Sequence, residues 1–165
     1  MNRFVRRTFC ALGLVAILAG CSGLTKSPTQ GLMFTAPAGF DSKASMLGMM
    51  QVWTADNDRQ VLMLLRLPAS MRMSDALKSA DLKDTKILAR RSIAICGKDS
   101  ATYMEVEGTR TDARTGKHDD RADIVYRRGT ADTLLALYVY PRKQKPNPAA
   151  QVALRGLCAK PGSSS

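Results

Sequence analysis

The sequence predicts an α+β fold, with a mainly antiparallel sheet of about five to seven strands covered by two or more helices. Short apolar runs recur between clusters of turn-forming residues, which is typical of strands joined as hairpins. Two further segments, at separate points of the chain, carry apolar residues at helical spacing instead. The chain has 165 residues, so beyond its N-terminal segment it is long enough for one domain, and a second is not expected.

The first predicted hairpin joins two strongly apolar runs, 46–54 and 60–67. Asp56-Asn57-Asp58 separates the runs, and this cluster favours a turn over a strand. Both runs are apolar on both faces instead of alternating. We therefore expect these strands to be central in the sheet and covered on each side.

The first predicted helix follows Pro68, which ends the second run. Ser74 can cap this helix, which extends to about Leu82. Its apolar residues fall on one face at helical spacing, and they are Met73, Ala76, Leu77 and Ala80. The pattern indicates a short amphipathic helix packed on the sheet.

Two more hairpins are predicted after this helix. Strand 87–96 reverses at Gly97-Lys98-Asp99-Ser100 into strand 101–111, and 112–120 is a polar loop. Strands 121–128 and 133–140 then form the third hairpin.

A terminal helix is predicted from Asn147, a good cap, with Pro148 at the first helical position. It extends to about Cys158. One buried stripe follows from the spacing of Ala150, Ala153, Leu154 and Leu157.

This order of elements is similar to that of the PsbP-like family of compact α/β/α sandwiches. The resemblance rests on segment 34–40 with its Pro-Ala-Gly turn, the paired strands to Leu67, the helix near 74–82, the Ile95-Cys96-Gly97 strand end followed by Tyr103, and the closing hairpin with its terminal helix. It implies a fold that serves mostly as a binding or assembly module. Neither the photosynthetic role of that family nor any of its sites is carried over.

The N-terminal segment ends in Leu18-Ala19-Gly20-Cys21, which resembles the lipobox of bacterial lipoproteins. Three arginines precede a ten-residue apolar stretch at 9–18, which is typical of an export signal and too short to span a bilayer. The resemblance implies that diacylglycerol is attached to the thiol of Cys21 and that its amine is acylated after cleavage. Two or three chains hold a protein stably at a membrane.

An ordinary signal peptide and an uncleaved anchor are the alternatives at this segment. Arg6-Arg7-Thr8-Phe9 also resembles part of a twin-arginine signal, but the flanking serine and lysine are missing, so general secretion is favoured. Ser22 favours the outer membrane in a Gram-negative host, with the protein facing the periplasm. The chain is thus divided into a signal peptide at 1–20, a lipidated flexible tether at 21–31, one domain at 32–159 and a disordered tail at 160–165.

Cys96 and Cys158 remain once Cys10 leaves with the signal and Cys21 carries lipid. An exported protein lies in a compartment that permits disulfides, so a Cys96–Cys158 bridge is expected. A redox pair is not indicated, because there is no Cys-x-x-Cys spacing. A zinc site would also need more ligands than these two cysteines and one distant histidine provide.

The chain is basic. Three of its 25 basic residues precede Cys21, which leaves 22 against 14 acidic residues, an excess of +8. In the cell envelope the available polyanions are lipid head groups and acidic polymers, and nucleic acid is not an expected partner. A solvated surface is the simpler interpretation, because most basic residues are scattered. Possible polyanion contacts are the concentrated ones, Arg90, Arg91, Arg127, Arg128, Arg142 and Lys143.

No catalytic or metal-binding residue set emerges, and no cofactor is expected. His118 stands among carboxylates in a polar loop, without a nucleophile. Asp56-Asn57-Asp58 lacks the glycine and distal glutamate of a calcium loop. Glu105 and Glu107 share one face of a strand, where pairing with arginine across strands is the ordinary use.

Methionines concentrate in the first half of the chain. They fill cores, but they also line adaptable apolar sites. A possible ligand groove comprises Met49, Met63, Met73 and Trp53. The sequence as a whole favours a non-catalytic, lipid-anchored binding or assembly module of the envelope, and the alternative is a carrier that holds a hydrophobic ligand in this Met-lined groove.

Overall fold

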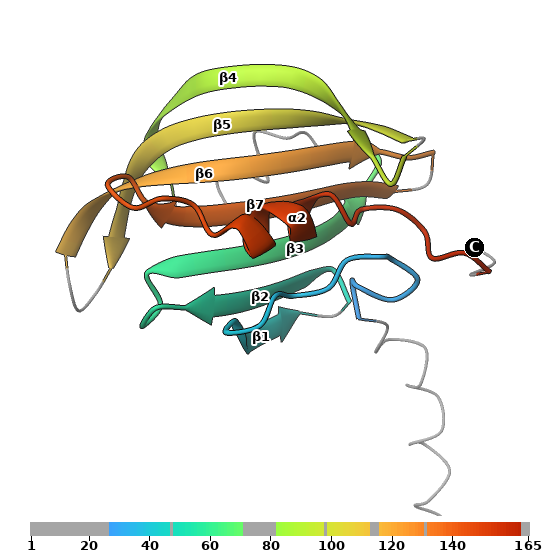
Figure 1. The fold of residues 1–165 in the computed structure, drawn as a ribbon, viewed down its shortest axis with the longest axis horizontal. Helices are drawn as coiled ribbons and strands as arrows, with labels where there is room; N and C mark the ends of the chain where they lie inside the picture. Colours follow the sequence, from blue (N-terminus) through green and yellow to red (C-terminus); the bar gives the residue numbers. More distant parts are fainter. Residues whose placement is uncertain are drawn as a thin grey trace, which may run out of the picture.

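Seven strands form a single antiparallel sheet in the computed structural model, which describes residues 27–46, 48–70, 82–97, 99–112, 116–130 and 132–162. The strands are β1 (Asp41–Met46), β2 (Met50–Ala55), β3 (Gln60–Pro68), β4 (Lys83–Ile95), β5 (Asp99–Asp112), β6 (Gly116–Arg128) and β7 (Asp132–Pro141). Helix α2 (Pro148–Leu154) follows β7. The strand order is β1-β2-β3-β7-β6-β5-β4, so β7 is the middle strand (Figure 1).

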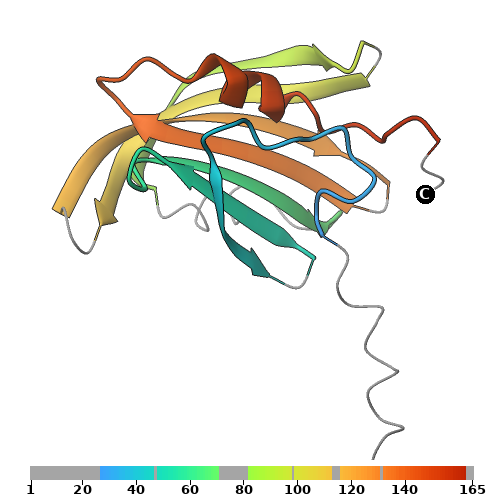
Figure 2. The same cartoon turned by 60° about the horizontal axis from the view of Figure 1, so that its bottom comes forward.

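The expectation of an α+β sandwich with two or more helices is wrong. Among the described residues there is one helix, of seven residues, and the fold is almost entirely β. The helix predicted near 74–82 lies outside the described residues, except for Leu82, which is buried. The physical reason for the difference is that the sheet is strongly curved (Figure 2) and irregular segments pack into its hollow face, where helices were expected.

The three predicted hairpins are confirmed. β2 pairs with β3, β4 with β5, and β6 with β7. An additional strand that the sequence pattern did not predict is β1, which pairs with β2 from Asp41↔Thr54 to Met46↔Met50. The pattern also did not predict most of the β5–β6 pairing, because the polar stretch expected to be a loop continues both strands as far as Asp112↔Gly116.

Residues Asp56, Asn57 and Asp58 form the β2–β3 turn, and all three have left-handed backbone angles, with φ of 55°, 52° and 66°. Asparagine and aspartate tolerate this region better than other residues with a side chain do. The side chain of Asp58 adds local support, because the Thr54 hydroxyl donates to its Oδ1 at 2.6 Å.

Two apolar clusters lie on opposite faces of the sheet. The first, here the helix-side cluster, contains alternate residues of β3 and β7 and Trp53 of β2, together with α2 and the irregular segments that precede β1 and follow α2. Its largest members include Phe34, Trp53, Leu62, Leu64, Tyr138 and Leu154. The opposite cluster includes Met63, Leu65, Met104, Ile124 and Leu137. Every residue of β7 from Thr133 to Tyr140 is buried, so this strand contributes to both clusters.

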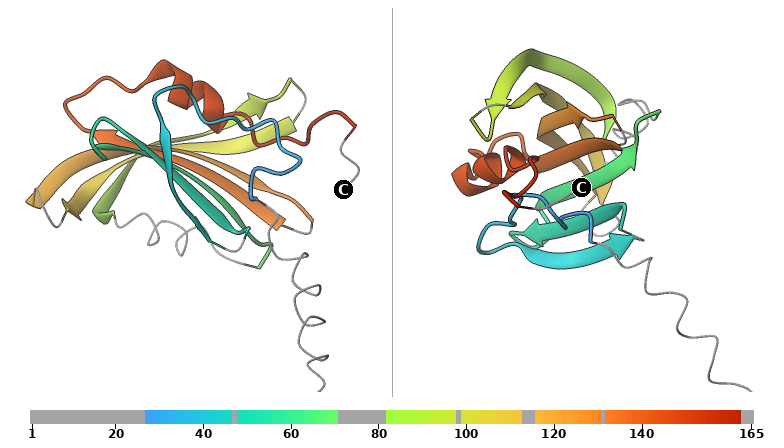
Figure 3. Two further views of the ribbon diagram at one scale, coloured as in Figure 1. Left: turned by 90° about the horizontal axis from the view of Figure 1, so that it is seen from below. Right: turned by 90° about the vertical axis from the view of Figure 1, so that its right-hand side faces the viewer.

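Helix α2 crosses the helix-side face (Figure 3), where polar contacts hold it. Its cap is Asn147, whose side chain accepts hydrogen bonds from the next turn, as the sequence predicted. The backbone N–H of Asn147 donates to the Tyr138 hydroxyl at 3.0 Å. Further along the helix, Gln151 donates to Asp123 at 2.8 Å, and Tyr103 donates to the same carboxylate at 2.7 Å. Burial, with the hydrogen bond to Asp123, raises the pKa of Tyr103.

The helix ends at Leu154, earlier than predicted, because the chain must turn to pass closely over the N-terminal segment. A β-carbon on Gly156 would lie only 2.7 Å from the Cα of Phe34, so a larger residue does not fit there without a shift. Beyond this crossing the Met33 amide donates to the Cys158 carbonyl at 2.8 Å, and the Lys160 amide donates to the Gly31 carbonyl at 2.7 Å.

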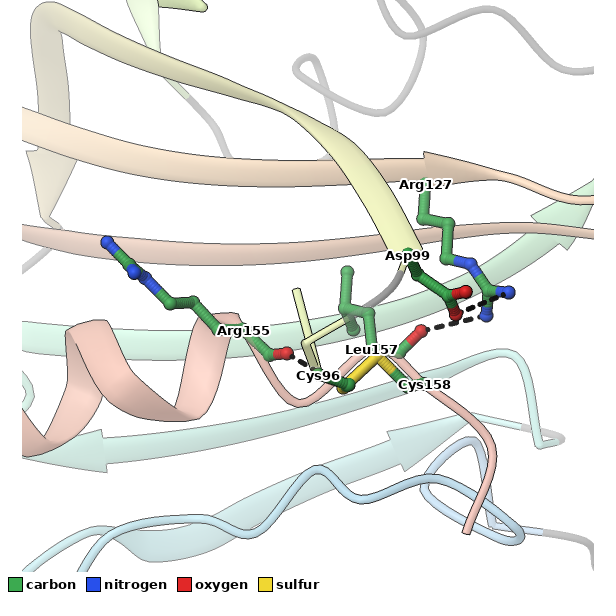
Figure 4. Close-up of a disulfide and its surroundings, with 6 residues drawn as sticks. All are labelled: Cys96, Asp99, Arg127, Arg155, Leu157 and Cys158. Carbon is green, nitrogen blue, oxygen red and sulfur yellow. Dashed lines mark hydrogen bonds and ion pairs between the residues drawn. A yellow bond between two sulfur atoms is a disulfide. The ribbon is translucent and has the colours of Figure 1, made fainter. Parts of the chain in front are cut away.

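A disulfide joins Cys96, just after β4, to Cys158, the pair expected from the sequence (Figure 4). Beside it, Arg127 forms an ion pair with Asp99 at 3.0 Å and donates to the Leu157 carbonyl at 3.1 Å. The disulfide and this arginine together fasten the C-terminal segment to the sheet.

Replacing both cysteines, Cys96→Ser with Cys158→Ser, is expected to lower the free energy of unfolding by about 4 kcal/mol, because the bond closes a loop of 62 residues. Urea unfolding of the oxidised wild type and the double variant measures the difference. Reduced wild type is the control and should unfold with the variant. Equal midpoints for oxidised wild type and variant would show that the bond does not stabilise the fold.

Candidate functional site

Three adjoining hollows, lined mainly by charged and polar residues, meet at Arg59, which lines all of them. They have volumes of about 590, 560 and 410 Å³. The largest is lined by Gly39, Asp41, Lys43, Thr54, Ala55, Asp56, Asn57, Asp58, Arg59, Arg110 and His118. The smallest, here the basic hollow, is lined by Arg59, Lys117, His118, Asp119, Pro141, Arg142 and Lys143.

The strand order explains why these residues meet. β3 and β6 flank β7, so the start of β3, the start of β6 and the end of β7 share one end of the sheet. Asp120 pairs with Pro141 in the β6–β7 register. The backbone then continues this contact, because the Arg142 amide donates to the Asp119 carbonyl at 3.0 Å.

A buried ion pair lies beneath the hollows. Nε of Arg110 donates to Oδ2 of Asp120 at 2.9 Å, and the Asp120 side chain is fully buried. Arg110 also donates to the Arg59 carbonyl at 3.2 Å, which fixes the backbone where β3 begins. Burial raises the pKa of Asp120 above its ordinary range, and the charge of Arg110 opposes that shift. Oδ1 of Asp120 and Nε of Arg59 are buried without a hydrogen-bond partner among the described residues.

The basic hollow carries four cationic side chains, Arg59, Lys117, Arg142 and Lys143, against one carboxylate, Asp119. Nearby carboxylates balance this charge only in part, since Arg142 lies 3.5 Å from Glu107 and Lys117 lies 4.0 Å from Asp84. Both basic side chains are more than half exposed. Arginine and lysine arranged in this way suit phosphate or carboxylate groups.

The largest hollow has a different character, because three aspartates and three basic residues line it together. Lys43 forms an ion pair with Asp58 at 3.7 Å. Such mixed lining offers donors and acceptors to a polar molecule without a strong preference for either charge.

The six basic residues selected from the sequence do not form one surface. Arg142 and Lys143 line the basic hollow. Arg90 and Arg91 are exposed on β4, at the edge of the sheet, and the Arg91 guanidinium stacks 4.4 Å from the ring centre of Tyr103. Arg127 and Arg128 lie at the opposite end of β6, where Arg127 holds the C-terminal segment and Arg128 donates to the Ala69 carbonyl at 3.3 Å.

Sequence reasoning missed Arg59, Arg110 and Lys117. Each stands singly among polar neighbours, without the local concentration of charge that drew attention to the other residues. Only the neighbouring order of strands β3, β7, β6 and β5 brings them to one place. The run of turn residues before Arg59 was visible in the sequence, but it did not indicate which strands would lie beside it.

Of the weaker catalytic and metal candidates, His118 and Asp56-Asn57-Asp58 meet at the largest hollow, whereas Glu105 and Glu107 line none of the three hollows. His118 lines both the largest and the basic hollow, and the described residues lining them include no serine or cysteine. Glu105 pairs with Arg121 at 3.4 Å, across strands. In the described part of the chain, no group of three or more histidine, cysteine, aspartate or glutamate residues could hold a metal ion.

The proposed Met-lined groove is not assembled by the described residues. Trp53 belongs to the helix-side cluster, where its ring lies 5.3 Å from that of Phe34, whereas Met63 belongs to the opposite cluster. Met49 is exposed in the β1–β2 turn. Met73 and Cys21 lie outside the described residues.

Among the described residues, no helix has the length and apolar character needed to cross a membrane.

Among the solved structures that resemble this chain are two that are distant in sequence. A chain from Bacteroides thetaiotaomicron VPI-5482 aligns with a TM-score of 0.49 at 10% identity, over 84% of this chain and 48% of that one. This chain therefore spans about half the length of the Bacteroides chain. A Pseudomonas aeruginosa protein of unknown function aligns with a TM-score of 0.44 at 14% identity, over 75% of this chain and 99% of that one. Neither a protein-family model nor a curated protein matches the sequence.

Replacing Arg110 with Met is expected to cost about 3–5 kcal/mol at neutral pH, because it leaves Asp120 buried without its counter-charge. The raised pKa of Asp120 favours its protonated form in the folded state. The stability that proton uptake by Asp120 gives to the folded state is therefore fully present below the ordinary aspartate pKa, about pH 4. It is lost as the pH rises through the raised pKa of the folded state. The cost of Arg110→Met should accordingly shrink on acidification.

Urea unfolding between mildly acidic and neutral pH measures this cost. The matched control is Arg110→Met with Asp120→Asn, in which the cost should no longer depend on pH. A cost of Arg110→Met that is the same at both ends of the pH range would contradict a charge-based role for the pair.

Proposed function

We propose that this protein is a non-catalytic, lipid-anchored accessory module of the cell envelope that binds an anionic envelope component at the basic hollow. The observation that carries the proposal is the gathering of Arg59, Lys117, Arg142 and Lys143 around one hollow at an end of the sheet. Envelope polymers and lipid head groups supply phosphate and carboxylate groups that match this charge.

The lipobox resemblance at Cys21 supports the anchor, and Ser22 favours the outer membrane of a Gram-negative host, with the folded domain facing the periplasm. The disulfide supports export in a different way. A bond that closes a long loop is a durable source of stability in an oxidising compartment, whereas thiols in the cytosol are kept reduced.

A binding role fits the hollows better than catalysis does. His118 and several carboxylates stand near one another, but the described lining residues offer no serine or cysteine nucleophile beside them. The hydroxyl of Thr54 already donates to Asp58 at 2.6 Å. What the side chains do offer is a fixed array of charges, which is suited to recognition.

Metabolic labelling with a fatty-acid analogue tests the anchor. Wild type should incorporate the label and remain in the membrane fraction, because two or three acyl chains hold a protein stably. Cys21→Ser should incorporate none. The control is Cys10→Ser, which removes a different cysteine and should leave labelling unchanged. Equal labelling of wild type and Cys21→Ser would refute lipidation at Cys21.

Sedimentation with purified envelope fragments tests the basic hollow, using the unlipidated Cys21→Ser protein so that the anchor does not contribute. Lys117→Gln with Lys143→Gln should weaken binding severalfold, and added salt should abolish the difference, because screening removes attraction between exposed charges. The matched control is Arg90→Gln with Arg155→Gln, two exposed residues away from the hollows, which removes the same charge elsewhere. Equal weakening in both variants would show that only net charge matters.

A further inference from the structure

The turn between β1 and β2 is unusual for its apolar character. Exposed turns are ordinarily built from polar residues, glycine and proline. Here the residues from Met46 to Met50 include four apolar side chains and Gly48, and no charge. Met46 and Met49 are 51% and 43% exposed. Met46, Gly48 and Met49 are called the apolar turn below.

The N-terminal segment reaches the body of the protein directly beside this turn. Ser27 donates to the side chain of Gln51, which is two residues beyond Met49, at 2.9 Å. Arg66 contacts both the turn and the N-terminal segment. Its backbone amide donates to the Met49 carbonyl at 2.7 Å, and its guanidinium donates to the Gln30 carbonyl at 3.3 Å. Figures 1 and 2 both show the start of the described chain alongside the β1–β2 turn.

The distance from this point to the lipid is short. Five residues, 22–26, separate Cys21 from Ser27. Even a fully extended chain of this length reaches only about 20 Å. A lipidated Cys21 would therefore hold the N-terminal end of the body, and with it the apolar turn, within about 20 Å of the membrane surface.

The largest hollow, which adjoins the basic hollow at Arg59, lies at the other end of β2. β2 begins at Met50, beside the apolar turn, and ends at Ala55, which lines the largest hollow. A strand of this length spans about 17 Å. When the apolar turn faces the membrane, the hollows at Arg59 face away from it, toward the periplasm.

We infer that the apolar turn is a membrane-contact site, at which Met46 and Met49 enter the lipid surface beside the acylated N-terminus. The inference rests on the proposed anchor at Cys21. Methionine is flexible and apolar, so it can pack among acyl chains of varied conformation. Interfacial elements of this kind bury their apolar side chains about 5–10 Å below the head groups. The contact adds an orientation that a flexible lipid tether alone does not impose.

Fluorescence quenching on vesicles tests this site in the full lipidated protein. Met49→Cys carries an environment-sensitive fluorophore, and the vesicles contain phosphatidylethanolamine and phosphatidylglycerol with a share of lipid bearing a nitroxide near the head group. The matched control is Thr111→Cys, exposed at the β5–β6 end of the sheet, far from the apolar turn (Figure 1). Met46→Cys provides a second position in the turn, and urea unfolding checks that each labelled protein is folded.

The expected result is quenching severalfold stronger at positions 49 and 46 than at 111, with emission shifted to shorter wavelength. Equal quenching at all three positions, or a label at 49 that behaves as in water, would overturn the inference. Shielding of position 49 from a water-soluble quencher without quenching by lipid would also overturn it and would indicate contact with a second copy of this protein. Mass analysis shows whether Cys21 carries lipid, and recovery with the vesicles shows whether the protein is bound. If the protein is lipidated and bound but the turn stays in water, the membrane-contact site is refuted and the anchor is not.

Discussion

The structure depends on the burial of β7 on both of its faces. From Thr133 to Tyr140 this middle strand is buried throughout, and its alternate side chains supply both apolar clusters. Neither face could stay exposed without leaving a large apolar surface in water. One face is covered by helix α2, which is the next element after β7, and by the irregular segments that precede β1 and follow α2. The disulfide and the close passage of Gly156 over Phe34 hold that covering layer in place.

Buried polar groups on this face hold helix α2 in position, because each of them forms hydrogen bonds with a partner on another element. Asp123 accepts from both Tyr103 and Gln151, and Tyr138 donates to Gln60 at 2.7 Å while it accepts from the Asn147 amide. These contacts connect the helix to strands on either side of β7. At the Arg59 end of the sheet the hydrogen bonding is less complete. One carboxylate oxygen of Asp120 has no partner among the described residues, and Arg110 supplies the positive charge that compensates the buried carboxylate. The hollows form at this end of the sheet.

The two ends of the sheet therefore differ in chemistry, and the difference suggests a division of roles. The β1–β2 end carries exposed methionines and receives the chain that leads to Cys21. The Arg59 end carries the cationic hollow. An orientation with the first end at a membrane and the second facing the periplasm would present the basic residues to envelope components and not to the lipid that holds the protein.

Local pattern in the sequence was sufficient for much of the fold. The turn residues around Asp56-Asn57-Asp58 and the alternation in the later runs predicted three hairpins, and Asn147-Pro148 predicted the start of α2. The fold class was nevertheless wrong, because sequence pattern does not show how far a long antiparallel sheet curves or that irregular segments can cover it in place of helices. The polar stretch before Asp120 also joined β6, since its pairing with β5 outweighed its loop-like composition.

By itself the sequence determined the short-range features: hairpins, a helix cap, two cysteines able to pair, and an N-terminal pattern that predicts a lipid anchor. Only the tertiary structure decided which residues share a site. Arg59, Arg110 and Lys117 meet because β3, β7, β6 and β5 are neighbours, and Trp53 and Met63 are kept apart because they lie on opposite faces of the sheet. The physical reason is that pairing between distant strands is set by the burial of whole faces, a property of the assembled sheet and not of any one segment.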